Sequence, residues 1–91
     1  MEVKEFLEKI GISRNPNQSG SRTYVVDIDD SDEFGKFYSL LEKSNLVELD
    51  DESSQITSDT MNVQFESDDF IITMLGDMVA DKYKMTIKTL K

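Results

Sequence analysis

The sequence predicts an α+β domain in which a largely antiparallel sheet of four to five strands has two helices packed on one face. Two segments in the first half have the apolar spacing of helices, and the later segments alternate like strands that follow one another directly. Helices that come early and strands that come in succession favour an antiparallel sheet with the helices gathered on one side. Because 91 residues have room for one core, we expect a single acidic domain over residues 1–91.

Residues 2–10 carry the first helical pattern. Apolar side chains recur there at the spacing of one helix face, at Val3, Phe6, Leu7 and Ile10. Gly11 suits the left-handed conformation that ends a helix, and Ile12 is expected to fold back on the last turn. Residues 13–21 are rich in turn-forming residues and predict a loop.

A strand and a second helix follow the loop. Residues 22–29 alternate apolar and polar side chains, which predicts a strand. Asp30 and Glu33 have the spacing of a capping box and predict the start of a helix over residues 31–44. The apolar face of this helix is expected to contain Phe34, Phe37, Tyr38 and Leu41.

The next segments read as strands. Residues 46–50 predict a short strand and residues 61–66 a longer one, with a weak strand around Ile56 between them. Residues 69–82 are ambiguous, because their apolar positions fit a helix while the aromatic and β-branched side chains after Asp69 fit a strand.

We favour the strand for the ambiguous segment, as a hairpin partner of residues 61–66 that turns at residues 67–69. Gly76 and Asp77 predict a second turn. The alternation of Tyr83, Met85 and Ile87 with polar residues then predicts the last strand.

The composition argues against an enzyme and against a cofactor. The chain has no Cys and no His, so the usual zinc ligands and the commonest catalytic bases and nucleophiles are missing. An EF-hand loop that starts at Asp27 or Asp29 lacks the required Gly and Glu, so no metal site is expected, with a weak divalent site as the alternative. Residues 1–5 mix charges, unlike a secretory signal, and the apolar stretch 70–75 is too short to cross a bilayer. We expect a cytoplasmic protein without membrane contact.

The formal charge of −9 is concentrated in the middle of the chain, where residues 27–69 hold fourteen acidic residues against two lysines. Three clusters are the candidate partner-binding residues: Asp27, Asp29, Asp30, Asp32 and Glu33; Glu48, Asp50, Asp51 and Glu52; Glu66, Asp68 and Asp69. Each follows a predicted strand, so we expect the three to converge on one edge of the sheet. The alternative is that each cluster only marks a strand end, a helix start or a turn, where Asp is locally favoured.

Such an edge would attract basic partners and repel nucleic acid. Carboxylates at alternate strand positions lie about 6.8 Å apart on one face, a separation of the order of neighbouring phosphates on one DNA strand. The C-terminal lysines Lys82, Lys84, Lys88 and Lys91 come without an aromatic platform, so they favour protection of an edge strand over direct nucleic-acid binding. The negative charge and its spacing therefore predict a protein that mimics DNA.

In its length, its lack of Cys and His and its acidic clusters, the chain resembles the anti-restriction DNA mimics of bacteriophages, and among them the Arn-like inhibitors of the restriction nuclease McrBC. The resemblance implies an inhibitor that occupies the DNA-binding groove of a host restriction nuclease, or of a similar DNA-binding protein, in the cytoplasm of a bacterial cell. It also implies a homodimer, for whose interface Met74, Met78 and Tyr83 are candidates. The alternatives are a phage inhibitor of another class, such as an anti-CRISPR protein or an antitoxin, and an acidic protein-interaction module without DNA mimicry.

Overall fold

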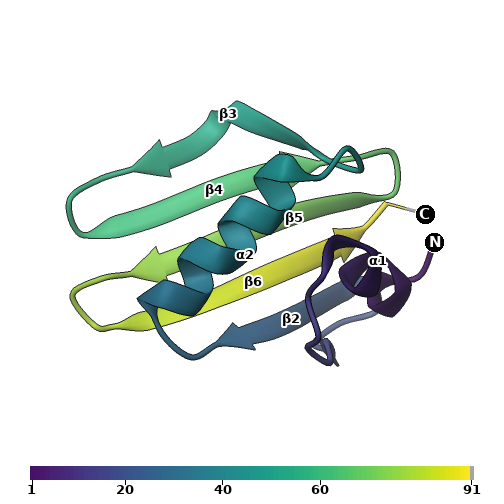
Figure 1. The fold of residues 1–91 in the computed structure, drawn as a ribbon, viewed down its shortest axis with the longest axis horizontal. Helices are drawn as coiled ribbons and strands as arrows, with labels where there is room; N and C mark the ends of the chain where they lie inside the picture. The colour runs from purple at the N-terminus through teal and green to yellow at the C-terminus, as the bar shows by residue number, and fades with distance from the viewer. Residues whose placement is uncertain (91) are drawn as a thin grey trace.

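The structure is a computed structural model that describes residues 1–90. Most of these residues lie in strands and the turns between them. In chain order the elements are α1 (Val3–Ile10), β1 (Asn17–Gln18), β2 (Thr23–Ile28), α2 (Ser31–Lys43), β3 (Glu48–Ile56), β4 (Thr60–Glu66), β5 (Phe70–Asp77) and β6 (Lys82–Thr89). The strands form one sheet in the order β1-β2-β6-β5-β4-β3, and every neighbouring pair is antiparallel (Figure 1). The predicted α+β class is confirmed.

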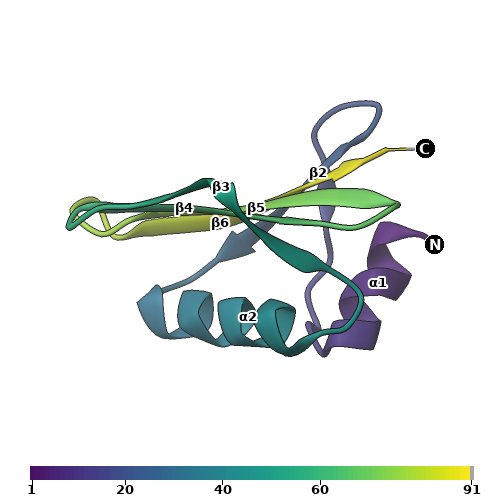
Figure 2. The same ribbon diagram turned by 90° about the horizontal axis from the view of Figure 1, so that it is seen from above.

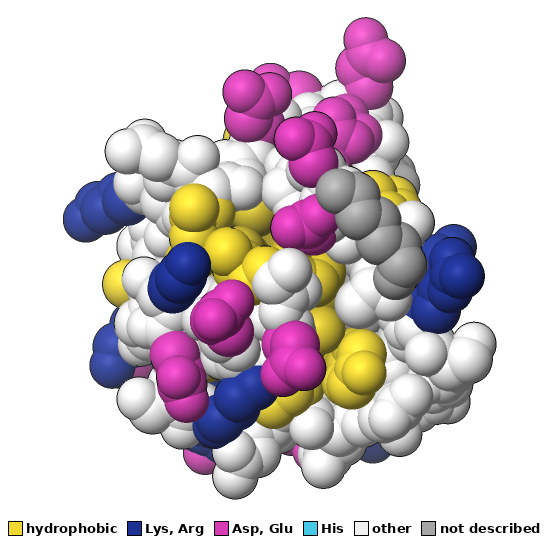
Figure 3. All heavy atoms as spheres, turned by 90° about the vertical axis from the view of Figure 1, so that its right-hand side faces the viewer, with side chains coloured by type: hydrophobic (Ala, Val, Ile, Leu, Met, Phe, Trp, Pro, Cys, Tyr) yellow, Lys and Arg dark blue, Asp and Glu magenta, His cyan; other side chains and the backbone are white. Residues whose placement is uncertain are grey.

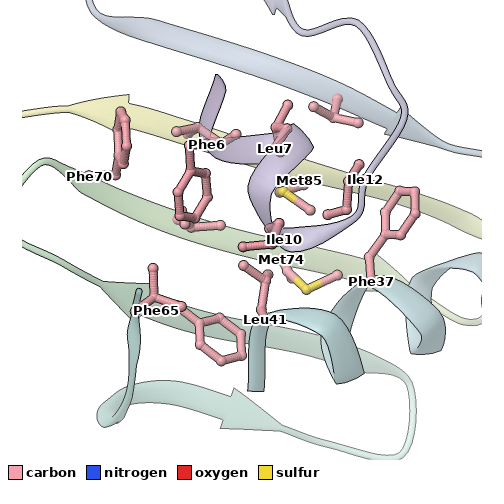
Figure 4. Close-up of a cluster of buried hydrophobic side chains, with 14 of the residues drawn as sticks. Phe6, Leu7, Ile10, Ile12, Phe37, Leu41, Phe65, Phe70, Met74 and Met85 are labelled. Carbon is pink, nitrogen blue, oxygen red and sulfur yellow. The ribbon is translucent and has the colours of Figure 1, made fainter. Parts of the chain in front are cut away.

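Both helices lie on the same face of the sheet, and the other face is open (Figure 2). Alternation along the strands explains this division, because Val63 and Phe65 of β4 are buried while Asn62 and Glu66 are exposed. The core between the helices and the sheet (Figure 4) contains Phe6, Leu7, Ile10, Ile12, Phe37, Leu41, Phe65, Phe70, Met74 and Met85, among others.

The helix ends follow the predicted signals. Gly11 has a left-handed φ of 93°, and its N–H approaches the carbonyl oxygens of Leu7 and Glu8. Ile12 folds back and is 1% exposed, with its N–H donating to the Leu7 oxygen over 2.8 Å. At α2 the Asp30 carboxylate accepts from the Glu33 N–H over 2.8 Å, as the capping box predicts.

The number of strands was predicted wrongly, since the sheet described here has six rather than four to five. One addition is β1, which is only two residues long and lies within the predicted loop 13–21, so no periodic pattern announces it. The predicted strand at 46–50 and the weak strand around Ile56 are one strand, β3, whose register shifts between Asp50 and Gln55. A bulge of this kind hides a strand from a period-two pattern.

The C-terminal half also needs corrections. The strand interpretation of residues 69–82 is right for β5, but the turn lies at residues 78–81, after Gly76 and Asp77. Gly76 continues the strand, paired with Met61 and Tyr83, and the Tyr83 ring lies so near that an added Cβ would come within 3.0 Å of it. Met74 is fully buried in the core, so it is not an exposed interface residue, whereas Met78 is 39% exposed.

The strand order places β6 between β2 and β5, so its lysines do not protect an edge. Lys82, Lys84 and Lys88 alternate with the buried Met85 and Ile87 and lie on the open face of the sheet. Lys91, the fourth lysine of that prediction, lies outside the described residues.

Candidate functional site: an acidic edge of the sheet

Two of the three acidic clusters meet along β3, the long outer strand. Glu48 of β3 lies directly opposite Glu66 of β4, and Asp68 follows in the turn after β4. The name acidic edge is used below for the six residues Glu48, Asp50, Asp51, Glu52, Glu66 and Asp68. Figure 3 shows acidic side chains gathered on the β3 side of this end of the molecule, while acidic and basic side chains mix at the opposite side.

The acidic edge has no cationic neighbour along the chain. Between Lys43 and Lys82 the sequence contains no Lys and no Arg, so β3, β4 and β5 are free of basic side chains. Within residues 1–90 none of the six carboxylates forms an ion pair. The nearby Asp69 differs, because its carboxylate lies 3.9 Å from the N-terminal amine of Met1. The acidic edge is therefore an uncompensated negative surface over the described part of the chain.

The bulge in β3 is held by side chains of its own residues. The Asp50 carboxylate accepts from the Ser53 N–H over 3.2 Å. The Ser54 hydroxyl donates to the Asp50 carbonyl over 2.7 Å and accepts from the Gln64 N–H over 3.0 Å, so it replaces a missing main-chain partner. These bonds fix the bulge and leave the carboxylates of Asp51 and Glu52 exposed to solvent.

A shallow hollow of about 330 Å³ lies where the two clusters meet. Its lining includes Glu48, Glu66 and Asp68, together with Leu46 and Val47 from the segment that enters β3. Like charges opposite each other on neighbouring strands repel, so the pair of Glu48 and Glu66 costs some stability. A cationic side chain placed in the hollow would relieve this repulsion.

The first cluster lies at the other end of the sheet. Asp27, Asp29, Asp30, Asp32 and Glu33 surround the junction of β2 and α2. Successive antiparallel pairings make β2 and β4 run in opposite directions, so their C-terminal ends lie at opposite ends of the sheet. The expectation that all three clusters converge on one edge is therefore wrong. Clusters that follow strands meet at one edge only if those strands run in the same direction, and these strands do not.

The chain itself uses most of this first cluster. Asp30 caps α2, and Arg14 binds both Asp29, over 2.9 Å, and Glu33. The second oxygen of Glu33 accepts from the Asp29 N–H over 3.0 Å, one residue before the position that a capping box predicts. The bonds to Asp29 and Glu33 raise the pKa of the Arg14 guanidinium. Asp27 lies opposite Lys84 in the sheet.

Two apolar side chains on β3 are exposed to solvent and were not predicted to be so. Leu49 is 38% exposed and Ile56 is 63% exposed, although both point to the side of the sheet that carries the helices. The alternation of Glu48, Leu49 and Asp50 was the signal in the sequence that Leu49 faces the helix side of the sheet. Such alternation indicates that the apolar face is covered only when the strand lies inside the sheet. At the edge, Leu49 remains partly uncovered.

Tyr38 of α2 has a raised pKa, to which Asp51 is the one acidic-edge residue that contributes. Burial raises the pKa of Tyr38, and the hydrogen bond with Glu42 and the negative charges of Glu42 and Asp51 raise it further. Tyr38 also packs edge-on against Phe65 of β4, with the ring centroids 5.7 Å apart. The pKa of Tyr38 is therefore expected to depend on the charge of Asp51 on β3.

The other features of the described residues are less distinctive. A larger hollow, about 750 Å³, lies at the end opposite to Glu48 and mixes acidic, basic and neutral side chains. Residues 1–90 contain no group of three or more acidic side chains arranged to hold a metal ion. In the same range, no helix combines the length and the apolar character needed to cross a membrane. Comparison of the chain with known protein families, with curated proteins and with solved structures gives no match.

Proposed function

We propose that the protein is an inhibitor that imitates DNA and that it binds a basic DNA-binding protein, such as a restriction nuclease, through the acidic edge. The observation that carries the proposal is the uncompensated charge of this edge: six carboxylates on β3, β4 and the turn that follows β4, without an ion pair in residues 1–90. A surface of this kind favours a cationic partner over nucleic acid.

The spacing of the acidic residues supports the comparison with DNA. Glu48 and Asp50 lie on one face of β3 at alternate positions, which separates such side chains by about 6.8 Å. The bulge then turns Asp51 and Glu52 toward solvent, and Glu66 continues the charge onto the next strand. The carboxylates of β3 thus form a short row with Glu66 beside it, and proteins that grip DNA place Lys and Arg against rows of phosphates.

The test measures binding to a purified restriction nuclease that cleaves modified DNA, with duplex DNA as competitor. A DNA mimic should be displaced by the duplex, and its affinity should fall steeply as salt rises from about 50 mM to 200 mM, because counterions leave the basic groove on binding. Displacement by duplex DNA without any salt dependence would contradict the electrostatic mechanism.

Two charge-matched triple variants localise the contact. Asp50→Asn with Asp51→Asn and Glu52→Gln should weaken binding by about tenfold or more and make its salt dependence shallower. The control, Asp27→Asn with Asp32→Asn and Asp59→Asn, removes the same charge at the other end of the sheet and should bind like the parent protein. Equal loss in both variants would show that only the net charge matters. Binding that duplex DNA does not displace would favour the acidic interaction module instead.

A further inference from the structure

The main chain of Leu49 faces outward at the edge of the sheet. β3 has a neighbour on one side only, β4. The Gln64 N–H points toward β3, since it donates to the Ser54 hydroxyl, so the main chains of Glu48 and Asp50, which lie opposite Glu66 and Gln64, face β4. In an antiparallel pair the residue between two such positions turns its N–H and C=O away from the partner. Within the described chain, those groups of Leu49 have no strand beside them.

The side chains around Leu49 differ on the two faces of the strand. The Leu49 side chain lies on the helix side and is 38% exposed, next to the buried Phe65 on β4. Glu48 and Asp50 point to the open face, together with Glu66. The edge thus offers an unpaired N–H and C=O, an apolar surface on one face and carboxylates on the other.

The outer strand of the opposite edge, β1, is shorter and carries no charge. β1 pairs with β2 at only two positions, and the residue before it is Pro16, which has no N–H to donate. The bulge also limits the regular part of β3, because the register shifts after Asp50. A strand added to this sheet therefore fits best as a short segment beside residues 48–50.

We propose that the partner contributes an extended segment with the pattern basic, apolar, basic, which adds to the sheet as a strand beside Glu48, Leu49 and Asp50. The central apolar residue would exchange two main-chain hydrogen bonds with Leu49 and cover its side chain. The Lys or Arg residues on either side of it would face Glu48 and Asp50, and the one nearest Glu48 would lie beside the hollow that Glu66 and Asp68 line. The proposal deepens the proposed function and rests on it for the choice of the acidic edge as the contact surface.

The probe is a capped seven-residue peptide, Gly-Thr-Lys-Val-Lys-Thr-Gly, titrated into isotope-labelled protein and followed by NMR. We expect shifts concentrated at the amides of residues 48–50 and slower hydrogen exchange at the Leu49 N–H. A second peptide has the same sequence with N-methyl-valine at the centre, which keeps the charge and the apolar side chain but replaces the N–H that would donate to Leu49 by N–CH3. It should bind about tenfold more weakly, as expected for the loss of a main-chain hydrogen bond.

Protein variants test the two faces of the strand separately. Leu49→Ala should weaken binding of the parent peptide while leaving the carboxylates in place. Glu48→Gln with Asp50→Asn should weaken the same binding while leaving Leu49 in place. The control Asp27→Asn with Asp32→Asn removes two charges far from β3 and should bind the peptide like the parent protein. The amide spectrum of each free variant shows whether its fold is retained.

The results separate this inference from the proposed function. Equal binding of the N-methylated and parent peptides, shifts that are not centred on residues 48–50, or no binding of the parent peptide would each overturn strand addition. If the protein still bound a DNA-binding protein competitively with duplex DNA, the proposed function would stand without it. If the peptide added to β3 while no DNA-binding protein was bound competitively with DNA, the strand site would stand and the DNA mimicry would fail.

Discussion

At the junction of β2 and α2, three of the five clustered carboxylates bind groups of the chain itself, namely those of Asp29, Asp30 and Glu33. Along the acidic edge, only the carboxylate of Asp50 has a hydrogen-bond partner within residues 1–90. The two regions are alike in composition, but the first stabilises the fold and the second faces solvent. The comparison teaches that acidic density alone does not identify a binding surface, whereas carboxylates left without partners are candidates for one.

The largest expected effect comes from removing the helix cap at the junction. Asp30→Ala should lower the free energy of unfolding by about 1 kcal/mol, because the Glu33 N–H loses its acceptor at the start of α2. Asp51→Ala on the acidic edge should change it by less than about 0.5 kcal/mol. Urea denaturation of the two variants measures the difference, and equal losses would remove the distinction between the regions.

Gly35 provides a control for the role of Asp30. It lies within α2, and an added Cβ would meet no atom within 4 Å. Gly35→Ala should therefore stabilise the helix by about 0.5–1 kcal/mol and offset most of the loss in the double variant with Asp30→Ala. A double variant no more stable than Asp30→Ala alone would show that Gly35→Ala does not stabilise α2.

A smaller effect of opposite sign is expected at the acidic edge. Glu66→Lys should stabilise the protein by roughly 0.2–1 kcal/mol, because it turns a repulsive cross-strand pair with Glu48 into an attractive one. Thermal unfolding at low salt measures this gain, which should shrink as salt is added. A loss of stability would mean that Glu66 has a favourable partner in the folded chain.

The smallest effect is a shift in the titration of Tyr38. Its raised pKa comes first from burial, then from the hydrogen bond and charge of Glu42, and least from Asp51. Asp51→Asn should therefore lower the Tyr38 pKa slightly, and Asp32→Asn should leave it unchanged. Ultraviolet absorbance of the tyrosinate, with Tyr24→Phe and Tyr83→Phe to isolate the signal, measures both. An unchanged pKa in Asp51→Asn would show that the field of the acidic edge does not reach α2.

The same tyrosine gives the sign of a pH dependence. A pKa raised in the folded state means that folding favours the protonated hydroxyl, so the contribution is fully present below the unfolded pKa of about 10. It is lost as the pH rises through the folded pKa. Above that point the stability should fall less in Tyr38→Phe than in the parent protein.

Local patterns predicted the helices well, because a helix is set by side chains three and four residues apart. The first was placed at residues 2–10 against Val3–Ile10, and the second at residues 31–44 against Ser31–Lys43. The strand order was out of reach of such patterns. β6 lies between β2 and β5, and this choice depends on packing across the whole core.

The candidate site was predictable in composition but not in arrangement. The acidic positions are plain in the sequence, yet the partner of Asp29 is Arg14, fifteen residues earlier in a segment that looked like an ordinary loop. Likewise, the outward main chain of Leu49 follows only from the position of β3 at the edge. Each of these facts depends on which segments meet in space.

The exposed position of β3 has a consequence for association between copies of the protein. A long outer strand can pair with the same strand of another molecule and so begin an aggregate. Here each copy would bring the same carboxylates, and like charges on neighbouring strands repel, which opposes such pairing. The charges that we propose to attract a cationic partner should thus also oppose self-association, and variants that neutralise the edge are best assayed at low protein concentration.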